Sequence, residues 1–197
     1  MNALIYDIEI KKAVPMRKEP KIEGIEYCDG WHDHANMGIS CVGVYDYADE
    51  RYRVFMDDNM AGFAALCERR DVIVSFNGLA FDNRVMAANG IVVPNERSYD
   101  LLVELWRAAG LAETFQYPSH MGFGLDATCE RNFGVHKSGN GALAPVLYQR
   151  KQFGELIDYC LNDVALTKRL FDAVMADAEI KDPRGSSVIL KLQKPQA

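Results

Sequence analysis

Hydrophobic and polar positions in the first ten residues predict a strand that is covered on both faces. Side chains alternate along a strand, so residues 4, 6, 8 and 10 share one face and residues 3, 5, 7 and 9 share the other. Both faces are apolar except at Asp7 and Glu9. Two neighbouring carboxylates on a covered strand repel each other and lose hydration, so they need a cation, a shared proton or an opening to water. A strand end turned to solvent is the structural alternative. Without a metal, we expect one of these acids to have a raised pKa.

The same patterns predict strands and helices along the rest of the chain. Short apolar or alternating runs predict strands at residues 39–45, 52–56, 72–76 and 97–100, and an edge strand at residues 188–192. Apolar residues spaced three or four apart predict helices at residues 59–70, 82–89, 102–109, 122–133 and 153–178. Strands that first form a meander and then alternate with helices predict an α/β fold, with a mixed β-sheet flanked by α-helices.

A long connection, residues 11–38, separates the first two predicted strands. Its first half is basic, and its second half, CDGWHDHANMG, combines a tryptophan with two histidines. A connection of this length inside a compact domain is usually functional or disordered. Lys11 and Lys12 beside Trp31 would suit phosphates and a stacked base, whereas a solvated insertion is the structural alternative.

Two further candidates for substrate binding lie in predicted turns and loops. The glycine-rich, basic segment at residues 134–141 predicts a mobile loop, and Lys137 within it would suit backbone phosphates. Asn77 follows the strand at residues 72–76 and would orient a substrate strand. A solvated loop and a simple turn are the respective alternatives.

Length and composition limit the class of protein. The chain has 197 residues, 49% hydrophobic and 25% charged, which is typical of a soluble globular domain with one sizeable core. No apolar run approaches the length of a membrane span, and five scattered cysteines without a C-x-x-C pair favour a reduced, cytoplasmic protein. Cys28, His32 and His34 are a weak zinc candidate, because no second ligand pair follows at suitable spacing. The net charge of −6 argues against a non-specific nucleic-acid coat protein, but it allows a nuclease with an acidic metal site.

Two more acids lie at positions where the predicted strands and helices do not themselves require a carboxylate. Asp82 follows the strand at residues 72–76, near a helix start, where the helix dipole would also favour a carboxylate. Asp163 lies in the middle of the helix at residues 153–178, and Tyr159 lies one turn before it on the same face. Each signal is weak by itself, because acids are common at helix starts and an acid and a tyrosine at this spacing are common on exposed helix faces.

Together these residues resemble the three motifs of the DEDD superfamily of 3′–5′ exonucleases. The motifs stand here as Tyr6-Asp7-Ile8-Glu9, as N-G-x-x-F-D at residues 77–82 and as Y-x-x-x-D at residues 159–163. A tyrosine four residues before the last aspartate, with Asp158 where the other branch has histidine, resembles the tyrosine subfamily. The resemblance covers most of the chain and implies an RNase H-like fold, as in proofreading exonuclease domains and RNase D.

The resemblance also implies two divalent metal ions, Mg²⁺ or Mn²⁺, held by four carboxylates. Phosphodiester hydrolysis needs charge stabilised on the attacking, phosphoryl and leaving oxygens, and two such ions with oxygen ligands can do this. By resemblance, Asp7 bridges both ions, and Asp82 serves the leaving-group ion. Glu9 and Asp163 hold the ion that activates water, and Tyr159 orients that water. Glu9 also contacts the terminal 3′-hydroxyl.

The sequence therefore predicts a metal-dependent exonuclease that releases mononucleotides from the 3′ end of nucleic acid, with single-stranded DNA favoured. A partner in DNA replication or repair would fit this activity. We expect one domain at residues 1–180, with an insert at residues 11–38, and a C-terminal tail at residues 181–197. One alternative is another RNase H-like nuclease, either an RNA exonuclease or a structure-specific endonuclease. The other is a catalytically silent RNase H-like module that binds nucleic acid.

Overall fold

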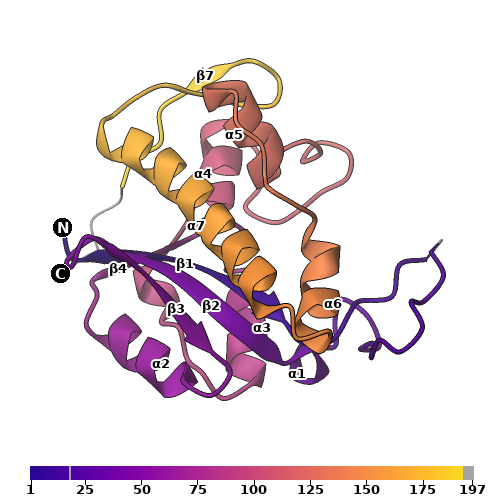
Figure 1. Ribbon diagram of the computed structural model, residues 1–197. Helices are drawn as coiled ribbons and strands as arrows, with labels where there is room; N and C mark the ends of the chain where they lie inside the picture. Colours follow the sequence, from indigo (N-terminus) through magenta and orange to yellow (C-terminus); the bar gives the residue numbers. More distant parts are fainter. Residues whose placement is uncertain (18, 193–197) are drawn as a thin grey trace.

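A five-stranded mixed sheet forms the centre of the fold in the computed structural model, which describes residues 1–17 and 19–192 (Figure 1). The strands are β1 (Ala3–Ile10), β2 (Ile39–Asp46), β3 (Arg51–Met56), β4 (Val72–Ser75) and β5 (Ser98–Asp100). Their order in the sheet is β3-β2-β1-β4-β5. β1 pairs antiparallel with β2 and parallel with β4, so the strand that carries Asp7 and Glu9 is the central one.

Helices cover both faces of this sheet (Figure 1). They are α1 (His34–Met37), α2 (Met60–Glu68), α3 (Asp82–Ala88), α4 (Leu101–Ala108), α5 (Leu125–Phe133), α6 (Ala144–Gln149) and α7 (Phe153–Met175). Two 3₁₀ turns, η1 (Asn95–Arg97) and η2 (Gly141–Leu143), precede β5 and α6. The apolar side chains of α2 and α3 pack on one face, and those of α4, α5 and α7 pack on the other.

β1 separates two hydrophobic cores because its side chains alternate between the faces. Leu4, Tyr6 and Ile8 belong to the core beside α2 and α3. Ile5 belongs to the core beside α4, α5 and α7, so Asp7 and Glu9 follow it along the face that α7 covers. The predicted alternation of β1 and the predicted α/β fold with a mixed, helix-flanked sheet are therefore confirmed.

Several predicted element ends are wrong by a few residues. α5 begins at Leu125 rather than at residue 122, because Gly122 has a positive φ of 88° and Gly124 is the extended N-cap. α7 ends at Met175 rather than at residue 178, because the chain turns at Asp177, whose φ is 50°. The short helices α1 and α6 were not expected, since neither is long enough to show a clear apolar period.

The insert at residues 11–38 is partly packed, which corrects the picture of a wholly solvated insertion. Ala13 and Tyr27 form an isolated β-bridge within it. Cys28 and Met37 are buried in the core beside α2 and α3. These two buried side chains hold the insert against the sheet. Lys18, which also belongs to the insert, lies outside the described residues.

The predicted C-terminal tail begins inside a strand pair. β6 (Ile180–Lys181) pairs with β7 (Ser187–Val188), separately from the main sheet, so the edge strand predicted at residues 188–192 is wrong. Leu190 is buried in the core beside α7. Residues 193–197 of the predicted tail lie outside the described residues. Within the described part of the chain, no helix has the length and apolar character that crossing a membrane would require.

Candidate active site

Close packing of α7 on the sheet brings late residues of the chain to β1. The approach requires a glycine in β2, because a Cβ on Gly43 would lie only 2.9 Å from Cys160 Sγ. The backbone N–H of Gly43 donates to that sulfur (3.2 Å), and the sulfur lies 3.6 Å from the backbone oxygen of Asp7. Cys160 and its neighbours on α7 therefore lie directly beside Asp7 of β1.

Asp82 reaches the same place from the turn between β4 and α3. Its Oδ1 accepts a hydrogen bond from the backbone N–H of Ile8 (3.3 Å). Asp100 holds the turn, since its two carboxylate oxygens accept from the backbone N–H groups of Asn77 (2.8 Å) and Leu79 (3.0 Å). Asn77 has a φ of 69°, a left-handed conformation that asparagine tolerates better than most residues. The turn therefore ends β4 abruptly and directs Asp82 at β1.

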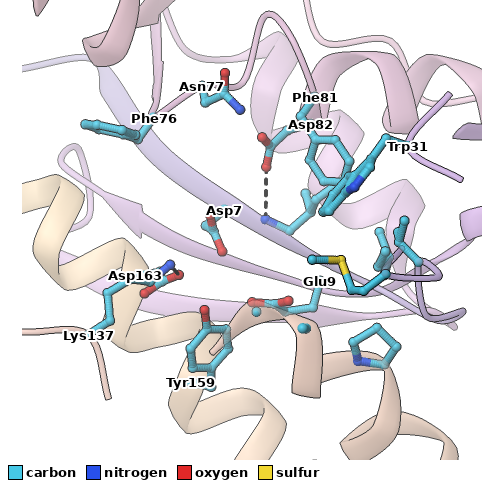
Figure 2. A pocket seen from close by; sticks show the side chains of 17 residues that line it. Asp7, Glu9, Trp31, Phe76, Asn77, Phe81, Asp82, Lys137, Tyr159 and Asp163 are labelled. Carbon is cyan, nitrogen blue, oxygen red and sulfur yellow. Dashed lines mark hydrogen bonds and ion pairs between the residues drawn. The ribbon is translucent and has the colours of Figure 1, made fainter. Parts of the chain in front are cut away.

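Residues that are far apart in the sequence meet in one pocket (Figure 2). The pocket lies where the C-terminal half of β1 faces α7, and carboxylates from both elements and from α3 point into it. Three of the predicted substrate-binding residues also line it. The predicted site residues in its lining are Asp7, Glu9, Trp31, Asn77, Asp82, Lys137, Tyr159 and Asp163.

The glycine-rich segment is packed against α7, which corrects the prediction of a mobile loop. The backbone N–H of Lys137 donates to Asp126 Oδ1 (2.6 Å). A Cβ on Gly139 would lie 3.1 Å from Tyr159 Cδ2, so a larger residue there would crowd the ring. Lys137 Nζ forms an ion pair with Asp163 Oδ2 and lies 5.4 Å from the centre of the Tyr159 ring. The loop thus places the positive charge of Lys137 beside the acids.

The insert contributes Trp31 to the pocket but not its two candidate lysines. Trp31 is 60% exposed and meets Phe81 edge-on, with 5.8 Å between the ring centres. Lys11 and Lys12 each pair with an acid elsewhere, at N–O distances of 2.8 and 3.4 Å, and neither lines the pocket. The zinc candidate is not supported, because Cys28, His32 and His34 do not gather into a metal-binding group in the described part of the chain.

Burial and mutual repulsion raise the pKa values of the clustered acids. Burial, with the negative charges of Asp82 and Asp163, raises the pKa of Asp7 well above its usual value. Burial and the charge of Asp7 do the same to the pKa of Glu9. Burial raises the pKa of Asp82 to about 7. These shifts agree with the expectation that the paired acids of β1 titrate high without a metal, and they mean that the cluster is short of positive charge.

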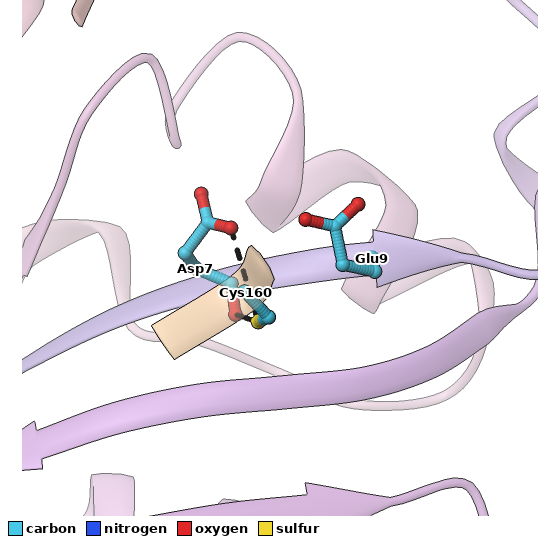
Figure 3. Close-up of side chains that lie close together, drawn as sticks. All are labelled: Asp7, Glu9 and Cys160. Atoms are coloured by element: carbon cyan, nitrogen blue, oxygen red, sulfur yellow. Dashed lines mark hydrogen bonds between the residues drawn. The ribbon is translucent and has the colours of Figure 1, made fainter. Parts of the chain in front are cut away.

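The residues present fit a divalent cation. Ligand atoms of Asp7, Glu9 and Cys160 lie within 4.8 Å of one another (Figure 3). Asp163 Oδ1 is buried and has no hydrogen-bond partner among the described residues. A buried carboxylate oxygen without a partner is unfavourable, and hard cations such as Mg²⁺ or Mn²⁺ prefer oxygen ligands. The carboxylates of the pocket are therefore suited to hold such an ion.

Two residues that organise the site were missed as functional positions. Asp100 was recognised only as a strand end before a helix, and it does cap α4 by accepting from Leu102 N (3.0 Å). Its bonds to the turn after β4 join residues more than twenty positions apart, which no local pattern reveals. Cys160 was recognised only as a core residue of α7, and nothing in the spacing indicated that its sulfur reaches Asp7.

Residues 25–175 match the family model described as the RNase H superfamily. Asp82, Tyr159 and Asp163 lie inside the matched range, whereas Asp7 and Glu9 precede it. The match and the mixed sheet together confirm the predicted RNase H-like fold. No curated protein matches the chain.

Among solved structures, a family B DNA polymerase from the hyperthermophilic archaeon Pyrobaculum calidifontis is similar, with a TM-score of 0.52 and 18% sequence identity. The similarity covers 88% of this chain and 25% of the polymerase. The chain thus spans about a quarter of the length of that protein. At this identity, the similarity concerns the fold alone.

Proposed function

Because this chain belongs to the RNase H superfamily, we propose that it is a metal-dependent 3′–5′ exonuclease that acts on single-stranded DNA and releases mononucleotides. One observation carries the proposal: four carboxylates and a tyrosine, from β1, α3 and α7, line a single pocket. The order and spacing of the three motifs that contain them support the same activity. The four acids are Asp7, Glu9, Asp82 and Asp163, and the tyrosine is Tyr159.

The carboxylates act in this proposal as ligands for two divalent ions, Mg²⁺ or Mn²⁺. When bound, these ions would stabilise negative charge on the attacking, phosphoryl and leaving oxygens of the phosphodiester. Asp163 offers its unpaired Oδ1, while Lys137 neutralises its Oδ2. Asp7 and Glu9 offer oxygens from one strand, and Asp82 faces them from the start of α3. The raised pKa values of these acids support a site that is completed by cations.

Tyr159 is suited to orient the attacking water. Burial, and the negative charge of Asp163, raise the pKa of its phenol, so the hydroxyl keeps its proton at neutral pH and can donate a hydrogen bond. The glycines at 139 and 141 pack against its ring and hydroxyl, where Cβ atoms would lie 3.1 and 3.4 Å away. The loop is therefore packed closely against the tyrosine on this side of its ring.

Three other residues of the pocket are proposed to hold the substrate. Trp31 exposes an aromatic face on which the terminal base can stack. Asn77, whose backbone N–H is held by Asp100, lies between Phe76 and Phe81 in the pocket and would orient the strand (Figure 2). Lys137 is close enough to the acids to contact the scissile phosphate.

The activity is tested with a 5′-labelled single-stranded oligonucleotide, in DNA and RNA forms, with Mg²⁺ or Mn²⁺. We expect a descending ladder on DNA, no cleavage of circular single strands, and loss of the ladder in Asp7→Ala and Asp163→Ala. A ladder on RNA alone would indicate an RNA exonuclease, and cut circles would indicate an endonuclease. Binding without cleavage under every condition would contradict the proposal and indicate a silent module.

A cytoplasmic role in DNA replication or repair belongs to the same proposal. All five cysteines are buried, unpaired thiols, which suits a reducing compartment. Removal of 3′-terminal nucleotides is a step that replication and repair both require, so we expect a partner from one of these processes.

A further inference from the structure

A second cavity opens beside the acidic pocket, between α4, the turn after β4 and the loop at residues 113–124. The two cavities meet at Asn77, which lines both. The second cavity is called the α4 groove here. The residues of its lining that bear on its role are Asn77, Arg84, Trp106, Phe115, His120 and Met121.

The wall of the α4 groove is built around a buried histidine. His120 is 3% exposed, and its Nε2 lies 2.8 Å from the backbone oxygen of Ala112. Its Nδ1 lies 3.2 Å from the backbone nitrogen of Gln116. The imidazole also meets the ring of Trp106 edge-on, with 4.7 Å between centres. These contacts fold the loop into a fixed wall, so the groove is a built feature rather than a gap under a loose loop.

The α4 groove offers exposed aromatic and apolar surface. Phe115 is 58% exposed and Met121 is 57% exposed, and both line this one cavity. Trp106 is almost fully buried, yet its Nε1–H has no acceptor among the described residues. Clustered exposed apolar residues of this kind usually mark a binding site.

The charge of the rim favours a nucleic acid as the occupant. Arg84 lines the groove with an exposed side chain, where it can contact a phosphate. Glu113, an acid in the lining, pairs with Arg107 at 2.9 Å, and this arginine also pairs with Glu104. An aromatic wall beside an unneutralised arginine is the combination that binds single strands, through base stacking and phosphate contact.

The arrangement of the acidic pocket also gives the strand a direction. Glu9 and Trp31 lie on one side of it and Phe76 on the other, with Asn77 between Phe76 and Phe81 (Figure 2). A terminal nucleoside beside Glu9 and Trp31 leaves the preceding nucleotides to pass Asn77, which is where the α4 groove begins.

We infer that the α4 groove holds a base of the substrate strand upstream of the scissile bond, with the base stacked on Phe115 and its phosphate beside Arg84. This inference rests on the proposed exonuclease function, and it adds a second base site that makes affinity depend on strand length.

The test compares KM and kcat for single-stranded DNA from two to eight nucleotides long, in the wild type and in Phe115→Ala. Because stacking on an aromatic side chain is worth about 1–3 kcal/mol per base, we expect KM for the longer strands to rise about tenfold. The dinucleotide, which is too short to reach the groove, should keep its KM. Phe115→Tyr retains an aromatic ring and should restore the wild-type KM. Val92→Ala, which changes an apolar side chain that is 75% exposed outside the groove, is the matched control.

An abasic nucleotide moved along the strand identifies the base that occupies the groove. At one upstream position it should raise the wild-type KM by about the same factor as Phe115→Ala, and it should have no further effect in that variant. Equal KM values in wild type and Phe115→Ala at every length, or the same abasic penalty in both, would overturn the inference and leave the proposed function intact. A groove that serves another protein would give this result. A wild-type protein that degrades no oligonucleotide would contradict the proposed function, and this inference with it.

Discussion

Lys137 forms an ion pair with Oδ2 of Asp163, while Oδ1 of the same carboxylate is buried without a partner among the described residues. Burial opposes a charged lysine here, but the charge and hydrogen bond of Asp163 prevail and raise the pKa of Lys137. The lysine therefore remains charged and neutralises part of the acidic cluster. A cation that enters the pocket competes with it for Asp163.

Removing this lysine should tighten metal binding. In Lys137→Gln the cluster loses its internal positive charge, so we expect Mn²⁺ to bind about tenfold more tightly, which corresponds to about 1.4 kcal/mol. Isothermal titration calorimetry measures the change. Lys168→Gln is the matched control, because Lys168 pairs with Asp172 (2.6 Å) away from the pocket. Weaker Mn²⁺ binding in Lys137→Gln would show that the lysine supports the metal site instead of competing with it.

Replacing Asp7 by asparagine should lower the activity and raise the stability of the metal-free protein. The carboxamide keeps the shape but removes a charge that burial and neighbouring acids disfavour, so the metal-free protein should gain about 1–2 kcal/mol in free energy of unfolding. The loss of a metal ligand should lower kcat about 10³-fold. Urea denaturation in EDTA and the oligonucleotide assay test the two effects. Asp177→Asn, an exposed change past the end of α7, should alter neither. A destabilised Asp7→Asn would contradict the repulsion argument.

Stability of the metal-free protein should fall as the pH rises from about 4 to 7. The pKa of Asp82 is raised from 3.8 to about 7, so the folded state binds more protons than the unfolded state in this window. The free energy of unfolding then decreases with pH, by about 1.4 kcal/mol per pH unit for each such acid. Saturating Mn²⁺ should remove the decrease, because the ionised carboxylates are then paired. Urea denaturation at pH 5 and pH 7 in EDTA measures this decrease in the free energy of unfolding. A rise in stability from pH 5 to pH 7 would contradict the raised pKa of Asp82.

The central strand and the meeting of the five motif residues in one pocket could be predicted because both depend on local patterns. The alternation in β1 places Asp7 and Glu9 on one face, and that face is the one that α7 covers. The helical period of α7 places Tyr159 one turn before Asp163. The motif order then brings Asp82 into the same set, and all five side chains line one pocket.

The rest depends on contacts between distant segments, which single-sequence patterns do not contain. The segment around Lys137 looks mobile because it is rich in glycine, yet its glycines allow the close approach to Tyr159 that orders it. Lys11 looks available for phosphate, yet it pairs with Asp57. His120 has no partner that the sequence could indicate, because its ring nitrogens contact backbone atoms of its own loop, at Ala112 and Gln116.

The approach of α7 to the sheet should be sensitive to a single methyl group. Gly43→Ala places a Cβ 2.9 Å from Cys160 Sγ and 3.1 Å from Val164 Cγ2, so these side chains or α7 itself must shift, and we expect a loss of about 1–3 kcal/mol in free energy of unfolding. Activity should fall as well, because Tyr159 and Asp163 move with the helix. Gly154→Ala is the matched control, since the position on α7 is open and alanine favours a helix by about 1 kcal/mol. Urea denaturation compares the two variants, and equal stability would contradict the close packing.

Anomalous diffraction from a crystal soaked with Mn²⁺ and a short single-stranded oligonucleotide tests the proposed two-metal site most directly. We predict two Mn²⁺ peaks about 3.5–4 Å apart, in contact with the carboxylates of Asp7, Glu9, Asp82 and Asp163, and the 3′-terminal nucleotide beside Glu9. A pocket that remains without Mn²⁺ while the oligonucleotide is bound, or Mn²⁺ peaks only at other acids, would contradict this site and the activity proposed for it.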